Sequence, residues 1–174
     1  MEKKIGTKEK TDFLARTPLF KDVEREKLAE IASKFRQRRA VAGEVLVEEG
    51  QPGEEMFFLM EGRVRVTRSL TLLTRRGFTD REKSFNYLDG GAGSNFGEMA
   101  LVAEMPRTAT VAAETECRLL VLSRENFRSV CESDYQLGYL VVTRICQQLC
   151  ELLSKSNNDV LKLATALSLA LTPG

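Results

Sequence analysis

The pattern of apolar and polar residues changes twice along this chain. Between residues 11 and 35, four apolar residues recur at helical spacing with charged residues between them: Leu28, Ile31, Ala32 and Phe35. Thr11 or Asp12 can cap a first short helix, and Pro18 interrupts the segment. Because an apolar stripe with a period near 3.6 is typical of an amphipathic helix, this part of the chain is predicted to be a broken helical lead-in.

From Gln37 onward the apolar period changes to two, and glycines at 43, 50, 53 and 62 divide the chain into short segments. Such segments between glycine turns predict short antiparallel strands, as in a sandwich or a barrel. The predicted strands are 42–50, 54–62, 63–73, 108–114 and 117–123, and the segment 83–98 leads into the glycine-containing motif at residues 96–111. The charged segment 74–82 is predicted to be a polar loop.

Helical spacing returns after Ser123, which can cap a helix over 123–131. A longer helix is predicted from about Asp134, and four of its apolar residues step by three, four and three: Val142, Ile145, Leu149 and Leu152. That spacing is typical of a coiled-coil seam. The polar run 154–159 interrupts the seam, and an apolar face then resumes with Val160, Leu163, Leu167 and Leu171. The sequence shows no internal repeat and no second globular domain.

Charge and composition narrow the classes of function. The 174 residues carry a formal net charge of +1, which gives no electrostatic footprint for nucleic acid, so the lysine-rich residues 1–10 are predicted to be a flexible basic tail. The absence of histidine removes histidine-ligated metals and histidine general bases, and we expect neither a metal site nor an enzyme. Four cysteines without a C-x-x-C pair, no signal peptide and no long apolar span predict a cytoplasmic protein with reduced thiols and no membrane segment.

The segment FGEMALVAEMPRTATV, residues 96–111, places Glu98 and Arg107 in a largely apolar run. Gly97 permits close backbone approach, and residues 98–102 can form one helical turn whose free N–H groups make an anion site. Arg107 adds a guanidinium that fits two phosphate oxygens, and Pro106 stiffens the chain before it. Charged groups are rarely buried unless paired. Glu98 and Arg107 therefore either pair with each other or await a ligand.

The glycine pattern and this segment together resemble the cyclic nucleotide-binding domain family. The resemblance rests on G-E-x5-G-x-x-G-E-x-M-F-x-L-x-x-G from Gly43 to Gly62, then F-G-E-M-A-L, and then P-R-T-A-T-V beginning at Pro106. It implies an α+β, mainly β fold, namely an eight-stranded antiparallel jelly-roll barrel with N-terminal and C-terminal helices. The domain would span 11–133 with a phosphate-binding cassette at 96–111, and 134–174 would form C-terminal helices that act as a lid or in dimerisation.

The same resemblance implies a site for cAMP or cGMP without a metal or another cofactor, formed by Gly97, Glu98, Met99, Ala100, Arg107, Thr108 and Ala109. Glu98 and the Gly97 backbone would take the ribose 2'-hydroxyl, and Arg107 and the Ala100 amide would take the phosphate. Thr108 would lie beside a syn purine, where its hydroxyl can bond to the 2-amino group of guanine. In the family a side chain of the last helix caps the purine, and the candidates here are Leu152, Leu153 and Asn157.

The expected function is that of a regulatory protein that binds cAMP or cGMP and changes the position of its C-terminal helices. The coiled-coil spacing predicts a homodimer through the helix from Asp134, and an effector protein is a further expected partner. About twenty residues follow Lys155, too few for a recognition helix, so no DNA-binding domain is expected. Two alternatives stand beside this prediction: a ligand-free barrel that acts as a dimerisation or protein-interaction module, and the regulatory fragment of a longer protein.

Overall fold

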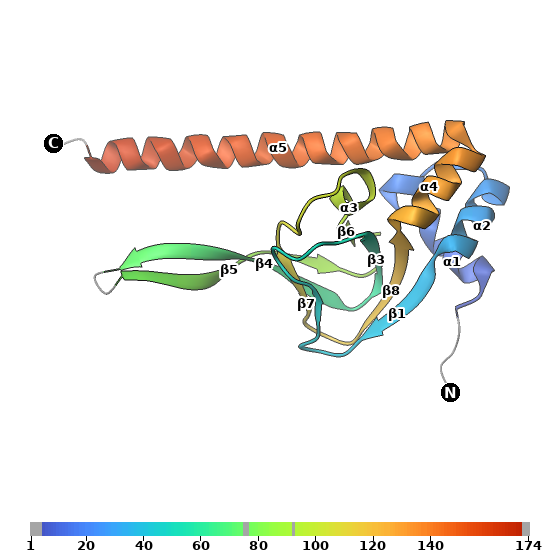
Figure 1. Ribbon diagram of the computed structural model, residues 1–174, viewed down its shortest axis with the longest axis horizontal. Helices are drawn as coiled ribbons and strands as arrows, with labels where there is room; N and C mark the ends of the chain where they lie inside the picture. The colour runs from blue at the N-terminus through green and yellow to red at the C-terminus, as the bar shows by residue number, and fades with distance from the viewer. Residues whose placement is uncertain (1–4, 75–76, 92, 172–174) are drawn as a thin grey trace.

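The first elements of the chain are helices that cover one end of the molecule. A computed structural model describes residues 5–74, 77–91 and 93–171 (Figure 1), and it begins with α1 (Thr7–Leu14), the 3-10 helix η1 (Pro18–Phe20) and α2 (Arg25–Lys34). The predicted tail is wrong for the part that is described, because Ile5 is buried in the core and α1 begins at Thr7. Thr11 therefore lies within α1, where it is buried, and does not cap it.

The strands form two antiparallel sheets that face each other. They are β1 (Arg36–Ala40), β2 (Val45–Val47), β3 (Glu55–Glu61), β4 (Arg63–Thr74), β5 (Gly77–Asp89), β6 (Asn95–Phe96), β7 (Thr110–Ala113) and β8 (Cys117–Ser123). Within the described residues, one four-stranded sheet has the order β1-β8-β3-β6 and the other β2-β7-β4-β5, so the chain passes between the sheets as in a jelly roll. Neither sheet closes on itself, so the predicted closed barrel is not confirmed and the architecture is a sandwich.

Strands β4 and β5 form a hairpin that is longer than the sequence pattern indicated. Their pairing runs from Arg63 opposite Asp89 to Thr74 opposite Gly77. The prediction of a polar loop over 74–82 is therefore wrong for residues 77–82, which belong to β5. Figure 1 shows this hairpin projecting beyond the two sheets.

Three helices follow from the cassette onward. The short α3 (Met99–Val102) lies in the cassette, α4 (Arg124–Ser133) follows β8, and α5 (Tyr135–Leu171) is one helix of 37 residues. The Ser123 side chain accepts a hydrogen bond from the Asn126 amide at 3.2 Å, which confirms the predicted cap. Asp134 likewise accepts from the Leu137 amide at 3.0 Å and so caps α5. The polar run 154–159 does not interrupt the helix.

Strands β3 and β8 lie between two apolar clusters, and this explains why their apolar runs are nearly continuous. Met56, Phe58 and Met60 face the cluster formed with the helices, while Phe57 and Leu59 face the cluster between the sheets. Successive residues of a strand point to opposite faces, so a strand that is covered on both sides needs apolar residues at every position. The last strand of this sheet's order, β6, lies at its edge, and the cassette begins in the chain at the end of β6.

The beginning of α5 belongs to the helical cluster and not to a separate lid. Leu137, Val141 and Ile145 are buried there, and Val142 and Leu149 pack against it. The predicted coiled-coil seam is therefore divided, because its first three residues contact the protein's own core and only its last, Leu152, is exposed. Figure 1 shows the rest of α5 continuing past the sheets in the same direction as the β4–β5 hairpin.

Candidate functional site

The backbone around Arg107 is held by the turn that precedes β3. The Arg107 amide donates to the Gln51 carbonyl oxygen at 2.9 Å, and the Gly50 amide donates to the Arg107 carbonyl oxygen at 2.9 Å. Pro52 and Pro106 form a further bridge of antiparallel type beside them. Two segments that are distant in the sequence, 50–53 and 105–107, are thereby joined at one place.

Two glycines leave the space in which the Arg107 side chain lies. A β-carbon on Gly53 would stand 1.9 Å from Arg107 Nε, and one on Gly97 would stand 2.7 Å from Arg107 Nη1. Gly97 also has a φ of +80°, a conformation that side-chain-bearing residues rarely adopt. The glycines of the two sequence motifs are therefore required by one and the same arginine.

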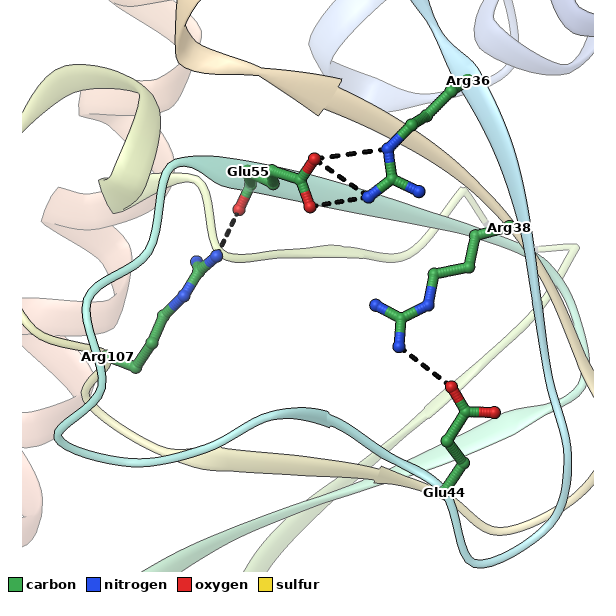
Figure 2. A network of polar contacts seen from close by, with 5 residues as sticks. All are labelled: Arg36, Arg38, Glu44, Glu55 and Arg107. Atoms are coloured by element: carbon green, nitrogen blue, oxygen red, sulfur yellow. Dashed lines mark hydrogen bonds and ion pairs between the residues drawn. The ribbon is translucent and has the colours of Figure 1, made fainter.

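The guanidinium of Arg107 contacts a carbonyl oxygen and an aromatic ring and no carboxylate. Arg107 Nη2 donates to the Glu55 carbonyl oxygen at 2.8 Å, as Figure 2 shows, and the group lies 6.0 Å from the centre of the Phe57 ring. The Glu55 carboxylate is bound instead by Arg36, at 2.7 Å. Burial lowers the pKa of Arg107, and the nearby Glu55 acts in the opposite direction. The positive charge is thus partly desolvated, and among the described residues no carboxylate forms a salt bridge with it.

A second arginine lies over the same ring. The Arg38 guanidinium is 5.8 Å from the Phe57 ring centre, and Arg38 Nη2 donates to Glu44 at 2.9 Å (Figure 2). Because Arg38 is already paired with a carboxylate, Arg107 is the arginine of this network that is available to an anion.

Glu98 directly precedes α3 and has no ion-pair partner among the described residues. Among the described residues it makes no salt bridge with Arg107, so the alternative in which the two simply pair is not observed. Burial raises the pKa of Glu98, while its own backbone amide and Arg107 lower it. A carboxylate in this setting is suited to accept hydrogen bonds from a neutral hydroxyl donor.

Two cavities meet at Glu98. The smaller, of about 60 Å³, is lined by Gly97, Glu98, Met99, Ala100, Met105, Pro106, Arg107 and Thr108. The larger, of about 530 Å³, is lined by Val66, Asn86, Leu88, Asn95, Phe96, Glu98, Gln148, Glu151, Leu152 and Lys155. The larger volume falls within the range of roughly 300–1,000 Å³ that is usual for small-molecule sites. Glu98 is therefore a lining residue of both cavities, the small one that Arg107 also lines and the larger, mainly apolar one.

The structure brings six of the seven predicted site residues together around the smaller cavity, and Ala109 is not among its lining residues. One predicted role does not match the geometry, because the Ala100 amide donates to the Gly97 carbonyl oxygen at 3.1 Å and is not a free donor. The Thr108 carbonyl oxygen accepts from Arg68 Nε at 2.7 Å, and its residue is exposed. Met99 is half-buried beside the cavity.

Helix α5 supplies part of the larger cavity, and the sequence pattern only partly located these residues. Of the three candidates for a cap over the base, Leu152 lines this cavity, whereas Leu153 and Asn157 do not. Gln148, Glu151 and Lys155 line it as well and were missed. Their spacing by three and four places them on one helix face with Leu152, which is the signal that could have found them.

Comparison with known proteins decides the family. The sequence profile of the cyclic nucleotide-binding domain matches residues 37–134, more than half of the chain. The chain belongs to the cyclic nucleotide-binding domain family. The matched segment contains the whole sandwich from Gln37 onward, the cassette and α4.

Members of this cyclic nucleotide-binding family are found among channels, kinases and transcription regulators. The chain is 36% identical over 126 residues to a cyclic nucleotide-gated potassium channel of Mesorhizobium japonicum, covering 72% of this chain and 31% of the channel. It is 30% identical over 129 residues to a cGMP-dependent protein kinase of Caenorhabditis elegans, covering 74% of this chain and 15% of the kinase. The chain thus spans less than a third of the length of these relatives.

A solved structure supports the same cyclic nucleotide-binding fold. The catabolite activator protein of Thermus thermophilus superposes with a TM-score of 0.71 at 25% sequence identity, over 85% of this chain and 63% of that one. Among the described helices, none combines the length and the apolar character needed to cross a bilayer.

Proposed function

We propose that this protein is a cytoplasmic receptor that binds cAMP or cGMP at the joined cavities and acts as a regulatory module. The observation that carries the proposal is that Arg107 and Glu98 do not pair with each other and instead line one small cavity, from which Glu98 leads into a larger one. The relatives include a cyclic nucleotide-gated channel and a cGMP-dependent kinase, which supports a cyclic nucleotide as the ligand.

The chemistry of a cyclic nucleotide fits the charges at this site. Its phosphodiester carries one negative charge, which the Arg107 guanidinium can neutralise with two hydrogen bonds without a metal. The ribose 2'-hydroxyl is a donor, and the Glu98 carboxylate is an acceptor beside it. The purine then occupies the larger cavity against Val66, Leu88 and Phe96, with Leu152 of α5 as its cap.

Binding also gives the Ala100 amide a new partner. In the structure this amide donates to the Gly97 carbonyl oxygen at 3.1 Å. We infer that a phosphate competes for the amide and breaks its hydrogen bond with Gly97, so that the turn at the start of α3 rearranges and α4 and α5 shift with it. A ligand can shift such an equilibrium only as far as it binds one state better than the other.

The exposed part of α5 supports a homodimer through this helix. Val160, Leu163, Leu167 and Leu171 are each more than 60% exposed, and none of them belongs to a core cluster of the described structure. Together with Leu153, they approximate an a and d repeat, which a second copy of the helix can cover. The surface that would contact the second copy lies in the second half of α5, because Ile145 and its neighbours pack in the core.

The same exposed face also fits the alternative, a protein-interaction module whose ligand site is not used.

Calorimetric titration separates the two functions. We expect cAMP or cGMP to bind with one nucleotide per chain, and 5'-AMP, which has no phosphodiester ring, to bind far more weakly. Arg107→Ala leaves a desolvated phosphate unmatched, which costs about 2 to 5 kcal/mol, or a loss of roughly tens- to thousands-fold in affinity. Arg107→Lys should lie between the two, because it keeps the charge without the planar fork. If the unmodified protein binds neither cyclic nucleotide, the interaction module is the function that remains.

A further inference from the structure

Arg124, the first residue of α4, is nearly buried and is bound to the back of the cassette. Its Nε donates to the Ala100 carbonyl oxygen at 2.6 Å, and its Nη2 donates to the Ala103 carbonyl oxygen at 3.1 Å. Ala100 lies within the four-residue helix α3 and Ala103 directly follows it, so the two hydrogen bonds hold this helix from behind. Only 9% of Arg124 is exposed, and the salt bridge that it makes within the described residues, with Glu104 at 3.2 Å, is to a side chain that is largely in solvent.

The same side chain reaches the turn that holds Arg107. Arg124 Nη2 also donates to the Gly53 carbonyl oxygen at 3.1 Å, and the Arg124 amide donates to the Glu54 carbonyl oxygen at 2.7 Å. Gly53 is the residue whose Cα faces the Arg107 guanidinium. One glycine thus contacts the arginine of the cavity on one side and the arginine of α4 on the other.

Helix α4 is in turn fixed closely to α5. Gly138 of α5 approaches α4 so closely that a β-carbon there would lie 2.9 Å from the Cβ of Cys131. A displacement of the first residue of α4 therefore cannot be absorbed by a loose contact between the two helices. The chain of contacts from Arg107 to α5 is continuous, by way of Gly53, Arg124, and the pair Cys131 and Gly138.

We propose that Arg124 is a positioning residue that couples occupancy of the phosphate cavity to the placement of α4 and α5. The proposal rests on the proposed function, because the occupant is a cyclic nucleotide. Its physical basis is that the guanidinium binds both segments that flank the cavity, the end of α3 and the turn at Gly53. When a phosphate draws Arg107 and α3 together, the three carbonyls move, and α4 moves with the donor group that binds them. Arg124 itself does not touch the ligand.

Amide hydrogen exchange with and without saturating cAMP or cGMP tests this. In the unmodified protein, nucleotide should change exchange in both the cassette and residues 124–149, by a factor within the roughly 5- to 150-fold range of coupling between two sites. In Arg124→Ala, saturating nucleotide should still protect the cassette, because Arg107 and Glu98 remain, but the response in residues 124–149 should be lost. Arg124→Lys, which keeps the charge but can reach fewer carbonyls, should retain part of that response.

Two controls keep the outcome interpretable. Arg118→Ala removes another largely buried arginine, which pairs with Glu9 and Glu61 away from the cassette, so it should lower stability and leave the exchange response intact. If Arg124→Ala does not fold, Arg124→Lys decides the matter. A full response of residues 124–149 in the Arg124 variants, or a bound unmodified protein in which only the cassette responds, overturns the proposal. Absence of any nucleotide binding to the unmodified protein overturns the proposed function instead, and the coupling with it.

Discussion

Gly53 and Arg107 are packed so closely that the glycine cannot carry a side chain while the arginine keeps its place. A β-carbon at Gly53 would stand 1.9 Å from Nε and 2.3 Å from Cζ of the guanidinium. The obstructed atoms belong to the far part of a flexible side chain, so the arginine can move away while the fold survives. The consequence falls on ligand binding and not on the sandwich.

Gly53→Ala is therefore expected to reduce nucleotide affinity about as much as Arg107→Ala, which is roughly tens- to thousands-fold. The matched control is Gly43→Ala, where φ is +86° but nothing lies within 4 Å of the added carbon. That control should cost stability and leave affinity unchanged. Calorimetry and thermal unfolding of both variants make the check. Normal affinity in Gly53→Ala would mean that Arg107 does not need its observed position to bind the ligand.

Glu98→Gln should weaken binding and stabilise the ligand-free protein. Burial holds the pKa of Glu98 above its usual value of 4.5, so this group favours folding below that value and loses its contribution as pH rises through the folded-state pKa. A glutamine avoids that loss at neutral pH. It also removes a charged acceptor for the 2'-hydroxyl, worth about 1.5 to 3 kcal/mol, or roughly 10- to 100-fold in affinity.

The pH dependence of binding provides an independent test of Glu98. Because the ionised carboxylate is the stronger acceptor, the affinity of the unmodified protein should rise with pH through the raised pKa of Glu98, and that of Glu98→Gln should not. Titrations in matched buffers from pH 4.5 up to neutral pH measure this, because the raised pKa lies above 4.5. Parallel profiles for the two proteins would remove Glu98 from the binding site.

Thr108→Ala should weaken cGMP binding several-fold and barely change cAMP binding. One neutral hydrogen bond to the 2-amino group of guanine is worth about 0.5 to 1.5 kcal/mol, and adenine has no such group. The backbone at this position is held through its carbonyl oxygen by Arg68, so the substitution removes the hydroxyl and the γ-methyl group and leaves this backbone contact in place. Equal losses for both nucleotides, or none for either, would show that Thr108 does not read the base.

Leu163→Glu together with Leu167→Glu should convert a dimer to a monomer without unfolding the sandwich, because both side chains are exposed and far from the core clusters. Ile145→Glu is the contrasting variant, since Ile145 is fully buried and a charge there should destabilise the fold itself. Light scattering at micromolar concentration measures the mass. A monomer in the unmodified protein at that concentration would rule out this dimer.

The pattern of apolar residues could predict the sandwich because most of its strands and helices have a buried face. The β4–β5 hairpin was only partly predicted, since a strand that projects beyond the core needs no alternation, and the charged residues 77–82 then resemble a loop. The pattern in α5 raised a different difficulty. Apolar spacing indicates that one face of a helix is buried. It does not show whether that face packs against its own chain, as it does at Ile145, or against another molecule.

Within the site, the motif spacing predicted the residues of the cassette better than those around it. Glu98 and Arg107 can be recognised in the sequence because they are charged residues in a largely apolar run. Arg124 instead follows a serine that caps a helix, and an arginine at such a position is usually on the surface. Its burial depends on carbonyl oxygens at 53, 100 and 103, and carbonyls are present at every position of every sequence. The role of such a residue becomes visible only in three dimensions.

The place where α5 loses its contact with the core has a consequence for how long a ligand stays. Leu149 is the last residue of the helix that packs against the helical cluster, and the side chains over the larger cavity, Glu151, Leu152 and Lys155, come directly after it. A helical segment without tertiary support frays at little cost. For the proposed nucleotide, we expect that escape requires only the part of α5 after Leu149 to unwind, while the sandwich stays intact. We therefore expect the residence time of the nucleotide to depend on local melting of this helix segment, and a second copy that covers the segment to lengthen it.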